Sequence, residues 1–436
     1  LEGIQLSKGV TSVAGGHEAM AGQINLEHRK PTDESPLFVN VYADQELRAE
    51  LNVATAHKMT DKLSHIMLAH SSINPLRLDH NGDGFMDSPT GKQFNISNRF
   101  LYVADNGIQM RAGVKYLNDK RKSGQMDFAP YVSRSDFDPS RPYGSEIVNE
   151  NVNGYFKLAI PLGKYVWDNE TQAAERSNLA FILDYDHFGT DSYFGQLKTY
   201  RANQNLFYLN AMYSCNISSQ PKLVGGLSAV SDNYEEFLED GQMINPLTLF
   251  RNGGERMIRS ENEAGAYAEY NCSLRDRLTV VTGVRGDYSG RHGFFATPRG
   301  HVRWAILPRL VLRGSAGLGY RSANVITDNL WMLATGRIIA DLNGTPINGA
   351  SIRSLDNLES SLTYGGSLTW NFRLGRDENA SLSFDYFHTR FSNQVIADQE
   401  YDNSNVRLYN SSGPSRTDTY QADFNWTPAT GFDILV

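Results

Sequence analysis

The sequence predicts an all-β protein, namely a large antiparallel transmembrane β-barrel. Three observations support this prediction. Successive segments have one apolar and one polar face, their connections alternate between long and short, and no apolar run approaches the ~20 residues of a membrane helix. The mean hydropathy of -0.44 is compatible with a barrel, because half of each strand faces water and the two faces average out.

The alternation is clearest in three consecutive segments, 278–289, 295–306 and 310–320. In the first, one face carries Leu278, Val280, Val284 and Tyr288, and the other carries Thr279, Arg285, Asp287 and Ser289. Side chains alternate across a strand, so each segment has one face for lipid and one for a watery lumen. We expect Arg285, Asp287 and Arg299 to face the lumen.

Roughly 16 or 17 strands of this kind can be placed along the chain. We expect them at 37–44, 48–57, 63–72, 94–104, 107–117, 151–161, 177–188, 203–216, 222–232, 261–273, 278–289, 295–306, 310–320, 359–372, 380–393 and 416–427, with another opening at Phe432.

Long connections are expected at 73–93, 118–150, 233–260, 321–358 and 394–415, and tight turns include 59–61, 105–107 and 308–309. Outer-membrane barrels have short periplasmic turns and long extracellular loops. Nearly every long connection therefore falls on the outer side if the first strand runs outward. Two connections do not fit this rule, 163–176 and 44–47.

Composition excludes some functions. Lys and Arg number 41 against 49 Asp and Glu, a net charge of -8 without blocks of like charge, which argues against nucleic acid as a partner. No nucleophile and base are spaced as an enzyme would need, so we expect no catalysis.

Cys215 and Cys272 are separated by one expected strand, nearly 10 Å, which is beyond the reach of a disulfide.

The first thirty residues carry a family resemblance. Ile4-Gln5-Leu6-Ser7-Lys8-Gly9-Val10, the Gly- and Ala-rich stretch 15–22 and Ile24-Asn25-Leu26 resemble the closing segment of the plug domain of TonB-dependent outer-membrane receptors. The chain departs from that pattern at Gly16-His17-Glu18, where a small Ser-Gly is common. Segments 320–326, 355–366 and 391–396 are similar to the Bacteroidetes branch of the family.

The resemblance implies a plug C-terminal part at 1–31, a linker at 32–36 and a barrel at 37–436. The family barrel has about 22 strands, so the resemblance implies a fragment that is truncated at its C-terminus and lacks most of the plug. Gly317 and Gly319 lie within a strand, where small residues indicate that the plug or a neighbouring strand approaches closely.

The resemblance also implies a function and a location. It indicates active import of a scarce nutrient (siderophore, metal chelate, haem or cobalamin) across the outer membrane of a Gram-negative bacterium. Partners would be outer-membrane lipid, lipopolysaccharide, the nutrient and, through a missing N-terminal segment, the TonB-ExbB-ExbD complex. A passive porin-like channel and an oligosaccharide importer of the SusC type remain alternatives.

Candidate ligand-binding residues come from the plug tail and from the outer loops, where aromatic rings suit ligand capture by stacking. They are His17, Glu18, Tyr143, Tyr193, Arg321, Asn324 and Trp331.

The loop at 79–90 is a separate metal candidate. Asp79, Asn81, Asp83 and Asp87 occupy positions 1, 3, 5 and 9 of the calcium-loop spacing, Gly84 fits the sharp turn at position 6, and Phe85 could offer its carbonyl. Position 12 is Thr90 instead of the bidentate Glu. Calcium binding and a purely polar turn are therefore both kept as interpretations.

Overall fold

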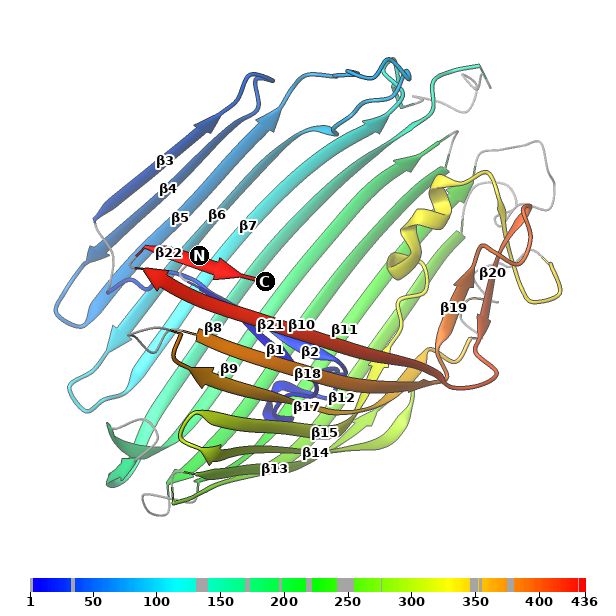
Figure 1. Ribbon diagram of the computed structural model, residues 1–436. Coiled ribbons are helices and arrows are strands. Elements are labelled where there is room, and N and C mark those ends of the chain that lie inside the picture. The colour runs from blue at the N-terminus through cyan, green and yellow to red at the C-terminus, as the bar shows by residue number, and fades with distance from the viewer. Residues whose placement is uncertain are drawn as a thin grey trace.

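A computed structural model describes residues 3–32, 36–130, 140–168, 173–195, 198–216, 222–240, 255–275, 277–345, 352, 355–374, 380–429 and 431–436. A sheet of 17 antiparallel strands curves into a barrel (Figure 1). Its strands are β3 (Leu37–Ala43), β4 (Ala49–Lys58), β5 (Leu63–Asn74), β6 (Thr90–Val103), β7 (Gln109–Gly124), β8 (Gly144–Asp168), β9 (Ala173–Phe194), β10 (Lys198–Asn216), β11 (Lys222–Asp240), β12 (Glu255–Leu274), β13 (Leu278–Ser289), β14 (Gly293–Leu307), β15 (Leu310–Ser322), β17 (Leu358–Phe372), β18 (Ala380–Ser392), β21 (Ser415–Ala429) and β22 (Phe432–Leu435).

The strands pair in chain order, each antiparallel to the next. In the closed strand order of the barrel, β22 is followed by β3. Residue-by-residue pairings are found from β3–β4 through to β21–β22, and none among the described strands joins β22 to β3. The strand β11 lies between β10 and β12, which carry Cys215 and Cys272, as the sequence predicted. Among the described residues, no helix is long and apolar enough to cross a membrane.

The barrel wall has apolar side chains on its outer face and polar side chains on its inner face, the opposite of a water-soluble protein. The apolar side chains of Val284, Trp304 and Phe384 are exposed on the outside, at 54%, 48% and 54%. On the inner face, Asp287 and Arg299 are only 1% and 3% exposed. The predicted faces of β13 and β14 are therefore confirmed. Near the end of β15, the ring of Tyr320 is half-buried and lies 4.9 Å from the ring of Phe295.

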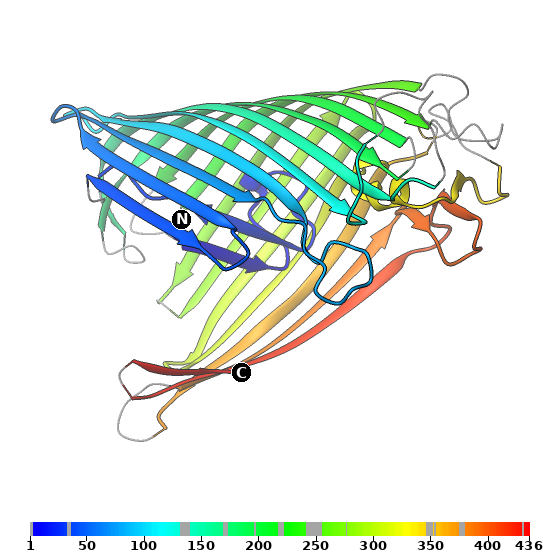
Figure 2. The same ribbon diagram turned by 90° about the horizontal axis from the view of Figure 1, so that it is seen from above.

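The N-terminal segment, residues 3–32, lies inside the curved wall (Figure 2). It contains β1 (Gly3–Lys8), a short 3-10 turn η1 (Val13–Gly15) and β2 (Gly22–Glu27), and β1 pairs with β2 in a separate two-stranded sheet. Of the expected linker at 32–36, residues 33–35 lie outside the described part of the chain.

Bonds from the inner wall hold this segment in place. Arg299 donates hydrogen bonds to the backbone carbonyls of Thr11, Ser12 and His17, at 3.4, 3.3 and 2.8 Å. The Ser12 hydroxyl donates to Glu269 Oε2 at 2.6 Å, and Lys8 forms an ion pair with Asp385. These bonds come from β14, β12 and β18, so the segment is fixed to several parts of the wall.

The N-terminal segment lies very close to β15 at Gly319, where the sequence predicted a close approach. A Cβ atom added to Gly319 would lie 2.8 Å from Met20 Cγ and 3.1 Å from Met20 Cα. The backbone of Met20 also accepts a hydrogen bond from Thr363 Oγ1 at 2.6 Å. The N-terminal segment therefore approaches β15 as the two glycines predicted, and Gly317 meets Arg299 of β14 instead.

The long connections gather at one end of the barrel, here called the mouth (Figure 1). The mouth loop, residues 323–357, contains the 3-10 element η3 (Thr327–Ala334) and β16 (Ile338–Ala340). The strand β16 pairs with β20 (Asn405–Asn410), which also pairs with β19 (Val395–Asp398), so this small sheet ties the mouth loop to the connection before β21.

Apolar side chains pack the mouth loop against the inner wall. Ile326, Met332 and Leu333 of the loop join Tyr200 of β10 and Leu238 of β11 in one cluster, each at most 2% exposed. The mouth end of the lumen thus has a small hydrophobic core of its own. This core fixes the loop above the N-terminal segment.

Candidate functional site

A cavity of about 490 Å³ lies between the top of the N-terminal segment and the inner wall. We call it the apex cavity. Gly15, Gly16, His17 and Glu18 form its floor, and side chains of β8 to β13 form its walls. Ligand pockets are commonly about 300–1,000 Å³, so this volume suits a small molecule.

The apex cavity is acidic. Its walls carry Asp184, Asp232, Glu261 and Glu263 together with the cations Lys157 and Arg285, and Glu261 is also paired with Arg259 and Arg291. Arg285 is largely neutralised, because it chelates the Asp287 carboxylate with bonds of 2.5–2.9 Å. The remaining field therefore favours a ligand that is uncharged or carries a cationic group.

His17 sits between a carboxylate and an aromatic ring. Its Nε2 is 3.6 Å from Glu263 Oε2, and its ring meets the ring of Phe295 edge-on at 5.1 Å. Burial, opposed in part by Asp287, lowers the pKa of His17 to about 4. The imidazole is therefore neutral at pH 7 and can both donate and accept one hydrogen bond.

Glu18 is held among other carboxylates. Burial raises its pKa, the neighbouring Asp232 and Glu261 raise it further, and Arg321 opposes the shift. Arg321 was expected in an outer loop, but β15 extends to Ser322 and includes it. Its guanidinium acts electrostatically on Glu18, although it does not line the apex cavity.

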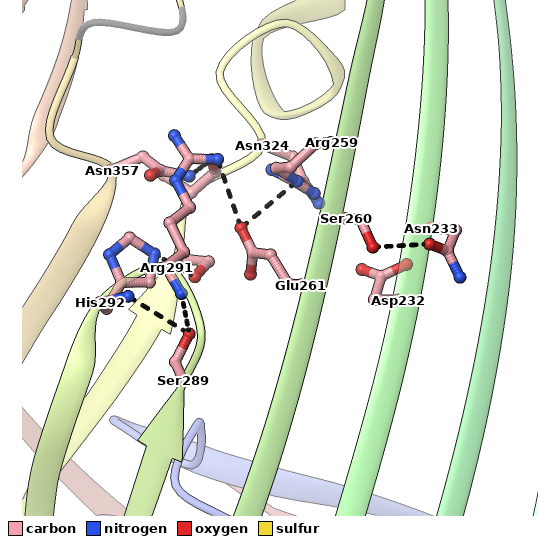
Figure 3. A network of polar contacts seen from close by, with 12 residues as sticks. Asp232, Asn233, Arg259, Ser260, Glu261, Ser289, Arg291, His292, Asn324 and Asn357 are labelled. Atoms are coloured by element: carbon pink, nitrogen blue, oxygen red, sulfur yellow. Dashed lines mark hydrogen bonds and ion pairs between the residues drawn. The ribbon is translucent and has the colours of Figure 1, made fainter.

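A chain of ions separates the apex cavity from the mouth loop (Figure 3). Glu261 lies between two guanidinium groups, with its Oε1 3.4 Å from Arg259 Nε and 3.5 Å from Arg291 Nη1. Arg259 also donates from Nη2 to Asn324 Oδ1, which connects β12 to the mouth loop. Arg291 belongs to the turn after β13, where its backbone N–H donates to Ser289 Oγ at 3.3 Å.

Three further candidates, Arg321 at the end of β15 and Asn324 and Trp331 of the mouth loop, lie outside the apex cavity. Arg321 pairs with Asp328, and the backbone N–H of Asn324 donates to the same carboxylate at 3.1 Å. Trp331 is 39% exposed on η3. None of these three side chains lines the apex cavity.

The two tyrosine candidates lie farther along the mouth. The Tyr143 hydroxyl donates to the backbone carbonyl of Ala334 and so supports the end of η3. Tyr193 was expected in an outer loop, but it belongs to β9, is 9% exposed and packs 5.9 Å from the ring of Phe128. Of the seven candidates, only His17 and Glu18 line the apex cavity.

Sequence reasoning missed the acidic wall. Asp232, Glu261 and Glu263 were not among the candidates, although the alternation of Arg259, Glu261 and Glu263 places all three on one face of a strand. That spacing was available in the sequence. The expected strand 261–273 already contained Glu261 and Glu263, and β12 begins earlier, at Glu255, and so also includes Arg259.

The loop at 79–90 folds around its own backbone. Asp79 accepts hydrogen bonds from the N–H groups of Gly82 and Gly84 at 2.7 and 2.8 Å, and Asp83 accepts from Phe85 at 2.8 Å. Asn81 Oδ1 accepts from the Asp83 N–H at 3.1 Å, while Asp87 binds the His80 ring at 2.8 Å.

Across the part of the chain that the structure describes, no three His, Cys, Asp or Glu side chains lie close enough together to hold a metal ion. Calcium binding by this loop therefore requires its carboxylates to turn toward a common centre. It stays a prediction.

Comparisons with known proteins place this geometry in context. No curated protein matches the chain. Among solved structures, the chain is similar to the ferripyoverdine receptor of the outer membrane of Pseudomonas aeruginosa bound to ferripyoverdine, with a TM-score of 0.68 and 15% identity over 99% of this chain and 59% of that chain. It is also similar to the siderophore receptor PirA from Pseudomonas aeruginosa, with a TM-score of 0.63 and 13% identity over 99% and 70%.

A double mutant of the Serratia marcescens hemophore receptor HasR, in complex with its hemophore HasA and heme, matches with a TM-score of 0.64 and 12% identity over 98% and 67%. The chain thus spans 59–70% of the length of these three structures. At 12–15% sequence identity, the similarity shows a shared fold and nothing more specific.

The match of the sequence to a protein family is more specific than the similarity of fold. Residues 72–434, well over half of the chain, match the family described as TonB dependent receptor-like, beta-barrel. Together with the 17-stranded antiparallel barrel, this match shows that the chain belongs to the TonB-dependent receptor β-barrel family.

Proposed function

We propose that the protein is an active import receptor of the outer membrane of a Gram-negative bacterium, which binds a scarce small-molecule nutrient in the apex cavity. The nutrient class is a siderophore, another metal chelate, haem or cobalamin. Solved structures of the same fold include receptors for ferripyoverdine, for siderophores and for a hemophore with heme, which supports this class. The reaction is binding followed by a conformational change, without covalent chemistry.

One observation carries the proposal, namely that wall residues bind the N-terminal segment inside the lumen. Arg299 alone reaches three backbone carbonyls of the segment, and Thr363 reaches a fourth at Met20. We infer that residues 1–31 are the closing part of a plug domain and that 37–436 belong to the barrel. A segment held in this way favours gated import over a passive porin-like channel.

Opening such a barrel needs work, because several buried hydrogen bonds must break together. Hydrogen bonds to charged donors contribute about 1.5–3 kcal/mol each. We propose that the TonB-ExbB-ExbD complex supplies this work from the inner membrane. The Bacteroidetes affiliation remains part of the same proposal.

Growth of a deletion strain tests the function. The strain is grown on defined ferric chelates, haem, cobalamin and an oligosaccharide as limiting sources, beside a strain without TonB. The proposal expects both strains to lose growth on the same metal-chelate, haem or cobalamin source. Equal growth on every source, or uptake that does not need TonB, contradicts active import, and a loss confined to the oligosaccharide favours the SusC-type alternative.

A pair of variants then tests the site. Glu18→Gln removes a carboxylate from the floor of the apex cavity and is expected to change the affinity for that nutrient. Asp61→Asn changes an exposed carboxylate of a short turn and serves as the matched control. Equal affinity of both variants and the wild type contradicts the placement of the ligand in this cavity.

A further inference from the structure

A groove of about 490 Å³ crosses the outer face of β15, β17, β18 and β21, which lie side by side in the barrel wall (Figure 1). We call it the outer groove. Gly366 of β17 lines it, and the residue directly opposite on β15 is also a glycine, Gly314, so the wall is thin at this level. Its rims are formed by the exposed side chains of Leu312, Leu368, Phe384, Tyr386 and Tyr420.

The outer groove is suited to an acyl chain. Phe384, Tyr386 and Tyr420 are 54%, 37% and 76% exposed, on the face of the wall that meets lipid in an outer-membrane barrel. A flat wall offers a lipid chain contacts on one side only. A groove surrounds the chain on several sides, so it gives one lipid molecule more dispersion contacts than its neighbours have.

Two arginines lie on the mouth side of the outer groove. Arg390 of β18 pairs directly with Arg416 of β21, and Tyr386 pairs with Tyr420 four residues further along the same two strands. Four residues correspond to about 13 Å along a strand. Because side chains alternate with a period of two, both arginines project from the same outer face as the two tyrosines.

The arginine pair is short of negative charge. Like charges directly opposite each other on neighbouring strands are destabilising. Arg390 is exposed and forms no hydrogen bond or ion pair with the residues that the structure describes. Asp418 lies within electrostatic reach of Arg416, and it also binds the Tyr386 hydroxyl at 3.0 Å and the His388 ring at 2.8 Å. One positive charge therefore stays unbalanced on this face.

The height of the pair in the wall matches a lipid headgroup. Arg390 pairs with Leu362 of β17, which lies eight residues from Trp370 near the opposite end of the strand. Eight residues span about 26 Å along a strand, or ~20 Å across the bilayer at a tilt of about 40°. The apolar band of outer-membrane barrels is about 25 Å tall, and long arginine side chains reach outward to the interface.

We propose that this surface binds one molecule of a phosphorylated glycolipid of the outer leaflet, lipopolysaccharide, with a phosphate at Arg390 and Arg416 and an acyl chain in the outer groove. The arginines lie at the mouth end, where the long connections identify the outer side. Guanidinium groups bind phosphate oxygens in a bidentate manner, and a phosphate between the two arginines removes their repulsion. This inference goes beyond the proposed import, because the outer face of the wall takes no part in passage through the lumen.

Native mass spectrometry of the purified, delipidated full-length protein in detergent tests the proposal. The probe is lipid A with two phosphates, and the comparison lipids are lipid A without phosphates and phosphatidylglycerol. We expect saturable binding of the phosphorylated lipid A, and binding at least roughly fivefold weaker for either comparison lipid. Inorganic phosphate at millimolar concentration should not displace the lipid, because it lacks the acyl chain.

Variants connect this binding to the surface. Arg390→Gln and Arg416→Gln should each weaken lipid A binding roughly fivefold, and about 25-fold together. Arg390→Lys keeps the charge and should retain most of the affinity. Ala422→Trp fills the outer groove from β21 without changing a charge, and it should also weaken binding. The control is Lys92→Gln, which removes an exposed cation from β6 on another part of the wall and should leave binding unchanged.

Several outcomes overturn the inference. Equal binding of lipid A without phosphates would show that the arginines do not hold the headgroup. Equal binding of phosphatidylglycerol would identify a surface for any anionic lipid, and displacement by inorganic phosphate would identify a site for the free ion. An equal loss in Lys92→Gln would show diffuse charge attraction, and full affinity in Ala422→Trp would place the acyl chain elsewhere.

Discussion

Arg299 of β14 binds the backbone of His17 across the lumen, with 2.8 Å between its Nη2 and the carbonyl oxygen. The same guanidinium reaches Thr11 and Ser12 from Nη1 and Leu318 of its own wall from Nε at 3.1 Å. One buried side chain therefore joins the barrel to both ends of the turn that forms the floor of the apex cavity. Arg299 therefore restrains the position of His17, together with the Tyr320 backbone N–H, which donates to the same carbonyl at 3.1 Å.

Replacing this arginine should free the turn without unfolding the barrel. In Arg299→Met, the carbonyls of Thr11, Ser12 and His17 lose a charged donor, so we expect local opening of residues 9–20 to become easier by about 3 kcal/mol. Amide exchange of those residues measures the change. Arg303→Met, which alters a more exposed arginine of the same strand, is the control. Unchanged exchange in Arg299→Met would show that the turn is held by other contacts.

The close approach at Gly319 predicts a steric effect. A methyl group there meets Met20 Cα at 3.1 Å, so Gly319→Ala must displace the backbone of the N-terminal segment. Overpacking of this kind costs about 1–3 kcal/mol. We expect a lower Tm in detergent than for Gly336→Ala, because nothing lies within 4 Å of a Cβ at Gly336. Equal Tm values would mean that the segment does not touch β15.

The pair of His80 and Asp87 predicts a pH window for the loop at 79–87. The hydrogen bond from His80 to Asp87 raises the pKa of His80 above 6.5, and bonds from the backbone and ring of His80 lower the pKa of Asp87 below 3.8. The contribution of His80 to the stability of the folded loop is complete below pH 6.5 and is lost as the pH rises through the raised pKa of His80. The aspartate contribution is present above pH 3.8 and is lost as the pH falls through the lowered pKa.

The loop should therefore be most protected between about pH 4 and pH 6.5. Amide protection factors of Gly82 and Gly84, corrected for intrinsic exchange, measure this profile. His80→Gln should flatten the alkaline side of the profile and leave its acid side in place. A wild-type profile that does not change between pH 5 and pH 9 would disprove the pairing.

Calcium binding by the same loop would change the pKa of His80. If Asp87 turns to a metal ion, it releases the His80 ring, so millimolar calcium should move the pKa of His80 back toward its ordinary value. An NMR titration of His80 with and without calcium measures the shift. Asp79→Asn should abolish the response and Asp61→Asn should preserve it. No response in the wild type would leave the polar-turn interpretation.

The strands could be predicted from the sequence because lipid and lumen impose a period of two. Val284 and Arg285 lie on opposite faces of β13, as their chemistry indicated. Strand ends were harder to predict. The strands β7 and β8 continue to pair as far as Gly124 and Gly144, well into an expected loop. Beyond the lipid both faces meet water, so the apolar signal stops before the backbone pairing does.

The same effect explains the connection at 163–176, which fitted neither class of loop. β8 and β9 still pair from Val166 to Asp168, after a register irregularity that begins at Leu162. The strands β8 and β9 therefore extend into the expected connection. The small sheet of β16, β19 and β20 could not be predicted from local pattern, because its short strands come from two distant connections.

Only part of the candidate site followed from the sequence. His17 and Glu18, which depart from the plug-like pattern, line one cavity. Their carboxylate neighbours come from β9, β11 and β12, and only the register of the barrel brings these strands together. Tyr193 failed as a loop candidate because β9 runs further toward the mouth than its apolar residues indicate.

An engineered disulfide between Val13 and Gly283 tests most directly that the wall holds the N-terminal segment within the barrel. A Cβ at Gly283 would lie 2.6 Å from Val13 Cγ2, so side chains at these two positions are in direct contact. In intact cells, with Cys215 and Cys272 replaced by Ala, the Val13→Cys and Gly283→Cys pair should crosslink within one molecule, and Val13→Cys with Gly336→Cys should not. Free thiols in the first pair, open to a membrane-impermeant reagent, would contradict the account.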